Sequence, residues 1–248
     1  MRISEARHFG ARLGRLTLLG PAVLLAACVS LGGGDGSAPR EVQVTADAVT
    51  ITGPRGFCVD PTSTRNEGDT GFVLLGNCAA ISGRARAQQP DIPAVLTAAV
   101  GARSDGGGAL TANLGELDGL FRSDAGRGLL SRSGDPASVT ILETRVAGDM
   151  FLLHARDTSA GALGGVAQDY WRAYMDVGPR LATLSVLALA DQEVSDQDAL
   201  LTLTAFADAV QSANSGNAAG ANAADLPQAE AQGGGGLFQG GLFQRIFR

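Results

Sequence analysis

The chain has 248 residues, of which 45% are hydrophobic and 18% are charged, and its formal net charge at pH 7 is −6. Lysine is absent from the sequence, which excludes a Schiff-base lysine, a Ser-x-x-Lys nucleophile pair and a P-loop lysine. The acidic balance argues against nucleic acid as a partner, because nucleic-acid binding requires basic surfaces.

The first 27 residues have the pattern of a secretory signal peptide. Four arginines lie within residues 1–15, and an apolar run covers residues 16–27. A membrane-spanning helix needs about 20 apolar residues, so this run is too short to span. A basic start, a short apolar middle and small residues at the end are typical of an export signal.

The stretch Leu25-Ala26-Ala27-Cys28 resembles the lipobox of bacterial lipoproteins. The resemblance implies that the chain is cut before Cys28 and that this cysteine carries palmitate and other lipid as a membrane anchor. Val29 replaces the aspartate that usually retains such proteins in the inner membrane, which implies a periplasm-facing location at the outer membrane. The alternative is an ordinary signal peptide followed by an unmodified cysteine. After the cut, 15 basic and 24 acidic residues remain, a net charge of −9.

Composition divides the rest of the chain into four parts. Residues 28–40 are Gly-rich and predict a flexible tether, whereas residues 41–212 carry nearly all the apolar periodicity and predict one domain. Residues 213–236 are low-complexity Ala, Gly, Asn and Gln, which predicts a disordered linker, and residues 237–248 form an apolar-basic C-terminal segment.

Within the domain, Cys58 and Cys78 predict a disulfide, since an even cysteine pair in an exported chain is usually bridged. A redox pair and a pair of metal ligands are the alternatives.

Most of the domain is predicted as strands. The sequence indicates an extended segment over 48–60 that turns at Gly53-Pro54, and a buried strand over 70–78. It also indicates a strand over 93–100, for which a helix is the alternative because the segment is rich in alanine. Two hairpins follow, over 137–156 with a turn at Gly148-Asp149 and over 169–189 with a turn at Gly178-Pro179. In the first arm of the second hairpin, Trp171, Ala173, Met175 and Val177 alternate with Tyr170, Arg172, Tyr174 and Asp176, which indicates a strand with one buried face.

Two helices are predicted, one over 113–123 and one that begins at Ser195. Ser195 followed by Asp198 makes a near capping box, and Leu200, Leu203, Phe206 and Val210 form an apolar stripe. The fold class is therefore α+β, a mainly antiparallel sheet with a C-terminal helix packed on it. This order of elements loosely resembles the PsbP/Mog1 fold.

Two longer stretches support a second resemblance. The segments "ITGPRGFCVDPTSTR", "GFVLLGNCAAI" and "YWRAYMDVGPRLATLSV" are similar to a group of exported alphaproteobacterial proteins of uncharacterised role, some of which are labelled "cation transport ATPase". A transport ATPase activity is unsupported here, because the phosphorylated Asp-Lys-Thr-Gly sequence of such pumps requires a lysine.

No motif in the sequence commits to a reaction, and we predict no catalytic residue, metal site or cofactor. Gly-x-Ser-x-Gly and His-Glu-x-x-His are both absent. His154 lies on a predicted strand, where a structural role competes with a place in a catalytic triad. Four acids at 191, 193, 196 and 198 offer oxygen ligands for Ca²⁺ but lack the EF-hand order, so a solvated acidic loop is the competing interpretation.

Two surfaces are candidates for partner binding. Tyr170, Arg172 and Tyr174 form an aromatic-cationic stripe on the predicted outer face of their strand, where a covering helix is the alternative. The C-terminal segment repeats Gly-Leu-Phe-Gln and carries Phe238, Phe243 and Phe247; it suits a groove on an envelope protein or a membrane interface, unless it is a frayed end.

The leading hypothesis is a lipid-anchored, periplasm-facing envelope protein that acts as a non-enzymatic interaction or accessory module. The alternative is an envelope hydrolase whose site is not visible in the sequence.

Overall fold

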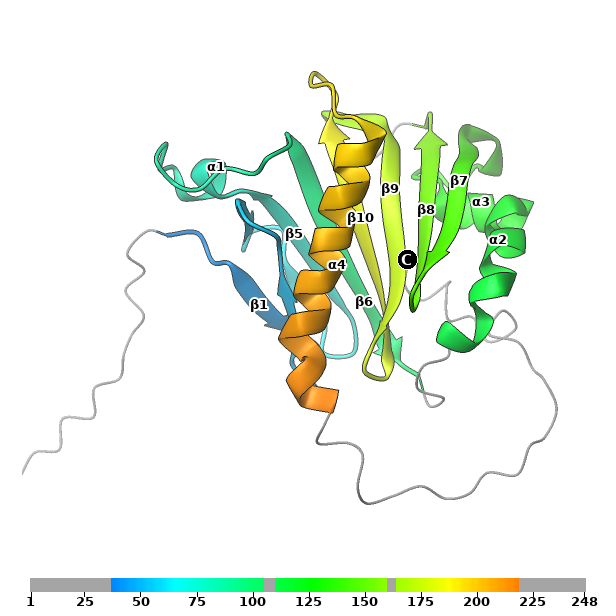
Figure 1. Cartoon of the computed structure of the whole chain (residues 1–248), viewed down its shortest axis with the longest axis horizontal. Helices are drawn as coiled ribbons and strands as arrows, with labels where there is room; N and C mark the ends of the chain where they lie inside the picture. The colour runs from blue at the N-terminus through cyan, green and yellow to red at the C-terminus, as the bar shows by residue number, and fades with distance from the viewer. Residues whose placement is uncertain (1–36, 105–109, 160–163, 219–248) are drawn as a thin grey trace, which may run out of the picture. The chain divides into compact units, whose positions relative to one another are not determined.

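The structure is a computed structural model that describes residues 37–104, 110–159 and 164–218. These residues form an α+β domain around one large antiparallel sheet, as predicted (Figure 1). In the described residues the order of its main strands is β3-β5-β6-β10-β9-β8-β7, and β4 pairs with β5. The bounds of the strands are Phe57–Val59 (β3), Arg65–Asn66 (β4), Gly71–Asn77 (β5), Ala94–Arg103 (β6), Val139–Ala147 (β7), Met150–Asp157 (β8), Val166–Val177 (β9) and Arg180–Leu189 (β10).

The sheet consists of two meanders that meet along one seam. The N-terminal half contains β3 to β6, and the C-terminal half contains β7 to β10. The C-terminal half joins the N-terminal half through its last strand, because β10 pairs with β6 on one side and with β9 on the other. This order places β10 and β9 in the middle of the sheet, so both of their faces need a cover.

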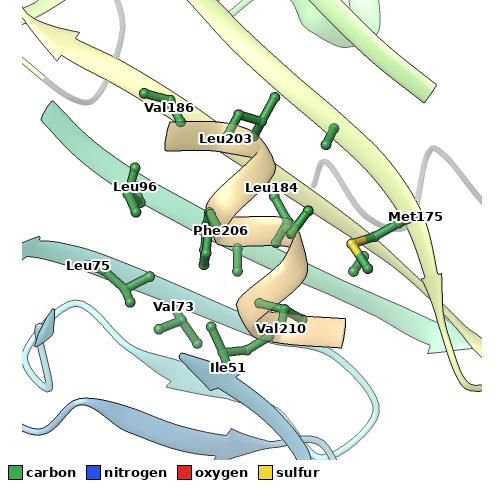
Figure 2. Packing of buried hydrophobic residues seen from close by; sticks show 14 of the residues in the cluster. Ile51, Val73, Leu75, Leu96, Met175, Leu184, Val186, Leu203, Phe206 and Val210 are labelled. Atoms are coloured by element: carbon green, nitrogen blue, oxygen red, sulfur yellow. The ribbon is translucent and has the colours of Figure 1, made fainter. Parts of the chain in front are cut away.

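One face of the sheet is covered by the last helix and a small hairpin. Helix α4 (Asp196–Ala218) crosses β10, β9 and the hairpin formed by β1 (Glu41–Val44) and β2 (Val49–Thr52). Figure 2 shows Leu203, Phe206 and Val210 pointing from α4 into a cluster with Leu75, Leu96, Leu184 and Met175 from the sheet. Leu203, Phe206 and Val210 of the predicted apolar stripe are fully buried, and Leu200, its fourth member, is partly buried against the same cluster.

The opposite face is covered by two short helices, α2 (Leu114–Arg122) and α3 (Asp124–Leu130). Leu117 and Phe121 of α2 lie in a second apolar cluster with Tyr170, Tyr174 and Leu181 of the sheet. Phe121 stacks on Tyr174, with 4.9 Å between the ring centroids. Three further short helices, α1 (Cys78–Ser82), η1 (Thr111–Asn113) and η2 (Pro136–Ser138), lie between strands in the described residues.

This second cover corrects one prediction. Tyr170, Arg172 and Tyr174 were expected on an exposed face as a partner surface, but Tyr170 and Tyr174 are 3% and 0% exposed. Arg172 is half-buried and donates to Ser185 Oγ at 3.0 Å. The alternation in β9 therefore separates two buried clusters, because helices cover both sides of this central strand.

The last helix extends further than the composition predicts. It continues to Ala218, so residues 213–218 are helical although they were assigned to the linker. The amide of Asn214 explains part of this extension, since it accepts from Thr50 N at 2.9 Å and donates to Thr50 O at 2.7 Å. The predicted tether before residue 37, the linker after residue 218 and the C-terminal segment lie outside the described residues.

Within residues 37–104, 110–159 and 164–218, no helix combines the length and apolar character that a membrane span requires.

Candidate functional site

A cavity of about 860 Å³ lies over one end of β8, β9 and β10, beside the first turn of α4. Its volume falls within the range of small-molecule pockets, about 300–1,000 Å³. Small apolar side chains contribute to its lining, namely Val166, Ala167, Val186, Ala188, Val194 and Ala199. Polar and aromatic side chains complete the lining, and the exposed polar ones form the rim.

The aromatic wall consists of His154 and Trp171. Strand register places them directly opposite each other on β8 and β9, and places Val186 of β10 beside Trp171. The two rings stack with their centroids 4.6 Å apart and an interplanar angle of 10°. They are 5% and 2% exposed, so neighbouring side chains enclose the wall.

Trp171 has two further features that bear on the wall. The guanidinium of Arg145, on β7, lies 5.5 Å from the ring centroid of Trp171, which is a cation–π distance. Trp171 Nε1 is buried and has no hydrogen-bond partner among the described residues. An unsatisfied buried donor costs free energy, and it belongs to a residue that lines the cavity.

An ion pair stands next to this wall. Arg156 donates from Nε to Asp169 Oδ1 at 2.5 Å and from a terminal nitrogen to Asp169 Oδ2 at 2.7 Å. The hydrogen bonds from Arg156 are the main reason that the pKa of Asp169 lies below its usual value. The positive charge of Arg156 is therefore matched within the pair.

The remaining rim is acidic. Glu193 and Asp196 line the cavity from the loop before α4 and from its first turn, and both are exposed. Asp196 Oδ1 lies 3.6 Å from His154 Nε2, and both residues line the cavity. Because Arg156 is paired with Asp169, the carboxylates of Glu193 and Asp196 give the lining an acidic balance that favours a positively charged group.

Ser195 also lines the cavity, which raises the question of a catalytic triad with His154 and Asp196. Its hydroxyl donates to Asp198 Oδ2 at 2.7 Å and accepts from Asp198 N at 3.1 Å. The bond from Asp198 N is the N-cap bond that the sequence predicts, and the bond to Asp198 Oδ2 ties the hydroxyl to the same residue. The geometry thus assigns Ser195 to the start of α4, with its proton directed away from the histidine.

The predicted sites have different outcomes. Cys58 and Cys78 are joined as a disulfide. Cys28, Phe238, Phe243 and Phe247 lie outside the described residues. Among the described residues, no group of three or more His, Cys, Asp or Glu side chains is placed to hold a metal ion, and the acids of 191–198 do not form one.

The sequence places His154 on a strand, with a structural or a catalytic role, and Trp171 on the buried face of another strand, but it does not bring the two together. The signal that joins them is the register of the β7–β8–β9 meander, which sequence alone does not provide because the β8–β9 connection is long. The tight turns at Gly148-Asp149 and Gly178-Pro179, in contrast, were correctly located.

Comparison with known proteins adds little to this geometry. No protein family and no curated protein matches the chain. Among solved structures it is similar to the extracellular domain of PknH from Mycobacterium tuberculosis, with 8% identity over 61% of this chain and 67% of that chain and a TM-score of 0.30. A likeness at this level says nothing about function.

Proposed function

We propose that the protein is an exported lipoprotein, anchored through lipid on Cys28 and facing the periplasm, and that it is a non-enzymatic binding module of the cell envelope. The disulfide between Cys58 and Cys78 supports export, because such bonds form and persist in oxidising compartments and are rare in the cytosol. The pattern around Cys28 supports the anchor and the outer-membrane location.

The cavity over His154 and Trp171 is the observation that carries the binding role. Its lining combines small apolar side chains with the stacked rings of His154 and Trp171, and Arg156 is paired with Asp169, so Glu193 and Asp196 determine the charge of its rim. The ligand class that fits this arrangement is a small amphipathic molecule with an apolar body and one positive charge.

Trp171 makes the binding role directly measurable, because it is the single tryptophan of the chain and it lines the cavity. Octylamine serves as a cationic amphipathic probe, and octanoate serves as the same chain with the opposite charge. We expect octylamine to change the fluorescence of Trp171 saturably and octanoate to bind at least tenfold more weakly.

A pair of variants separates cavity binding from adsorption to the surface. Ala188→Phe places a ring in the lining of the cavity, whereas Ala213→Phe adds the same ring to an exposed position of α4. The first variant should lose the octylamine response and the second should keep it. Equal responses of both variants, or equal affinity for the two probes, would reject the cavity as the binding site.

The lipid anchor has its own test. Cells labelled with a fatty-acid probe should incorporate label into the wild-type protein, and Cys28→Ala should lose the label and appear in the soluble periplasmic fraction. A wild-type protein without label would contradict the proposed lipid anchor. The proposed binding role would still be tested separately by the fluorescence experiment.

A further inference from the structure

A second hollow lies on another side of α4, between this helix and the turn that joins β2 to β3. Its volume is about 420 Å³, and its walls are mostly apolar: Pro54, Phe57, Ile92, Leu201 and Ala205. We call it the α4 groove. Phe57 and Ile92 are buried beneath it, whereas the side chain of Leu201 is 58% exposed at its edge.

Leu201 has no role in the core of the domain. The residues that α4 directs into the sheet are Leu203, Phe206, Ala207 and Val210, all fully buried. Leu201 lies outside that stripe, and it is the one large hydrophobic side chain of α4 that is exposed in the described residues. Because Leu201 borders the hollow, it makes one continuous apolar surface with Pro54, Phe57, Ile92 and Ala205, and contiguous apolar surface is what marks an interaction site.

The rim of the α4 groove is acidic. Asp198 belongs to the first turn of α4, and Asp91 lies on the opposite side. Arg55 lies 3.6 Å from Asp91, but both side chains are at least 70% exposed, so this pair is weak and screened. The groove therefore suits an occupant with large apolar side chains and a positive charge.

We propose that the C-terminal segment of the same chain, residues 237–248, docks into the α4 groove through its Leu-Phe pairs. This segment follows Gly236 and contains the Leu-Phe-Gln sequence twice, at 237–239 and 242–244, and it carries Arg245 and Arg248. The leucine and phenylalanine side chains match the apolar walls, and the arginines match Asp91 and Asp198.

The length of the intervening chain fits this contact. Leu201 and Ala218 are 17 residues apart on α4, which corresponds to about 25 Å along the helix. The 18 residues from 219 to 236 are rich in Gly and Ala, and a flexible chain of that length has a root-mean-square span of roughly 23 Å. Effective concentration is highest when the span of a linker matches the separation of its two sites, which favours docking within one molecule.

Docking of this kind goes beyond the binding role of the first cavity. It holds the C-terminal segment against its own domain, so any envelope partner of that segment has to compete with the α4 groove.

Cross-linking tests the contact in the chain from residue 28 onward with Cys28→Ser. Thr202 lines the groove, and Gly240 lies between the two repeats, so Thr202→Cys with Gly240→Cys reports docking of either repeat. We expect this pair to form a disulfide within one molecule under mild oxidation. Adding Leu201→Arg should slow its formation at least tenfold.

The matched control is Leu142→Arg, which replaces another exposed leucine, 42% exposed, on β7. It should leave the rate unchanged, and circular dichroism verifies that each variant is folded. Hydrogen exchange gives a second readout, since deleting residues 237–248 should increase exchange in residues 54–57 and 201–205. Equal cross-linking rates with and without Leu201→Arg, or cross-links only between two molecules, would overturn the proposal.

Discussion

At the scale of single residues, the most unusual group is Arg180, a charged side chain that is only 3% exposed. It donates from Nε to both carboxylate oxygens of Asp47, at 2.8 and 3.1 Å, and from a terminal nitrogen to Gly101 O at 2.9 Å and to Asp69 O. Arg180 thus ties the turn of the β1–β2 hairpin to the end of the seam between β6 and β10.

Asp47 allows a matched test, because Arg103 contacts the same carboxylate from the surface at 3.1 Å and is 56% exposed. Removing Arg180 leaves the carbonyl oxygens of Gly101 and Asp69 without their donor, whereas Asp47 keeps Arg103. Arg180→Gln should therefore lower the free energy of unfolding by about 3 kcal/mol. Arg103→Gln should cost under about 1 kcal/mol, as for other exposed pairs. Urea unfolding of both variants measures the difference, and similar losses would contradict the role of burial.

Asp157 is a buried carboxylate that should make the domain sensitive to acid. Burial raises its pKa, but hydrogen bonds from the Ser159 hydroxyl and from the backbone N–H groups of Arg132 and Ser159, with a further one from Ser138, outweigh it and hold the pKa below the usual value. A depressed pKa contributes stability above the unfolded value, near 3.8, that is lost as the pH falls through the folded value.

The melting temperature should therefore fall between about pH 5 and pH 2. Asp157→Asn should melt lower at pH 7 and show a smaller decrease toward pH 2 than the wild type, since its amide does not titrate. Melting curves across this range measure both effects. A variant whose decrease equals that of the wild type would show that other carboxylates dominate.

At the scale of elements, sequence reasoning located the strands of the two hairpins but misjudged what covers them. Gly148 and Gly178 occupy turn positions with φ of 62° and 58°, which glycine adopts freely, so local chemistry marks those turns. The cover of β9 depends on α2, which lies about 50 residues earlier in the chain. Alternation within one strand reports two distinct faces but does not report whether a distant helix lies on the second one.

Helix α2 covers the face of β9 that carries Tyr170 and Tyr174, so this face belongs to the core. Phe121 stacks with Phe151 and Tyr174, at centroid distances of 5.7 and 4.9 Å, and is fully buried. Phe121→Ala should cost about 3–5 kcal/mol, the usual range for a buried aromatic side chain. Val146→Ala, at a position 53% exposed on β7, should cost under about 1 kcal/mol. Urea unfolding compares the two, and a small loss at Phe121 would mean that α2 is dispensable.

The candidate cavity shows the same limit of sequence reasoning. Trp171 and His154 are 17 positions apart, and no local pattern joins them. Their contact requires that β8 pairs with β9 in one particular register, and the sequences of the two strands do not specify this register. The cap of α4 at Ser195, by comparison, depends on four consecutive residues and was predicted correctly.

At the scale of the whole molecule, the disulfide fixes the N-terminal half of the sheet. Cys58 lies in β3 and Cys78 begins α1 just after β5, 20 residues later. Closing a loop of this length stabilises a protein by about 3 kcal/mol. Replacing both cysteines with serine should lower the melting temperature by roughly 6–12 °C. Calorimetry measures the shift, with the wild type under reducing conditions as the control; an unchanged melting temperature would show that the short strand β3 is held by other contacts.

The seam between β6 and β10 affects how the chain folds. Its paired residues are 77 to 94 positions apart in the sequence, so the sheet closes by one non-local event, a kind of step that is intrinsically slow. Until it closes, each half presents a long apolar edge strand, and such edges pair readily with other chains. The edge of β10 in one molecule accepts β6 of a second molecule as well as its own, and reciprocal exchange gives a domain-swapped dimer. We expect refolding at high protein concentration to trap such dimers, visible by gel filtration, and dilute refolding to avoid them.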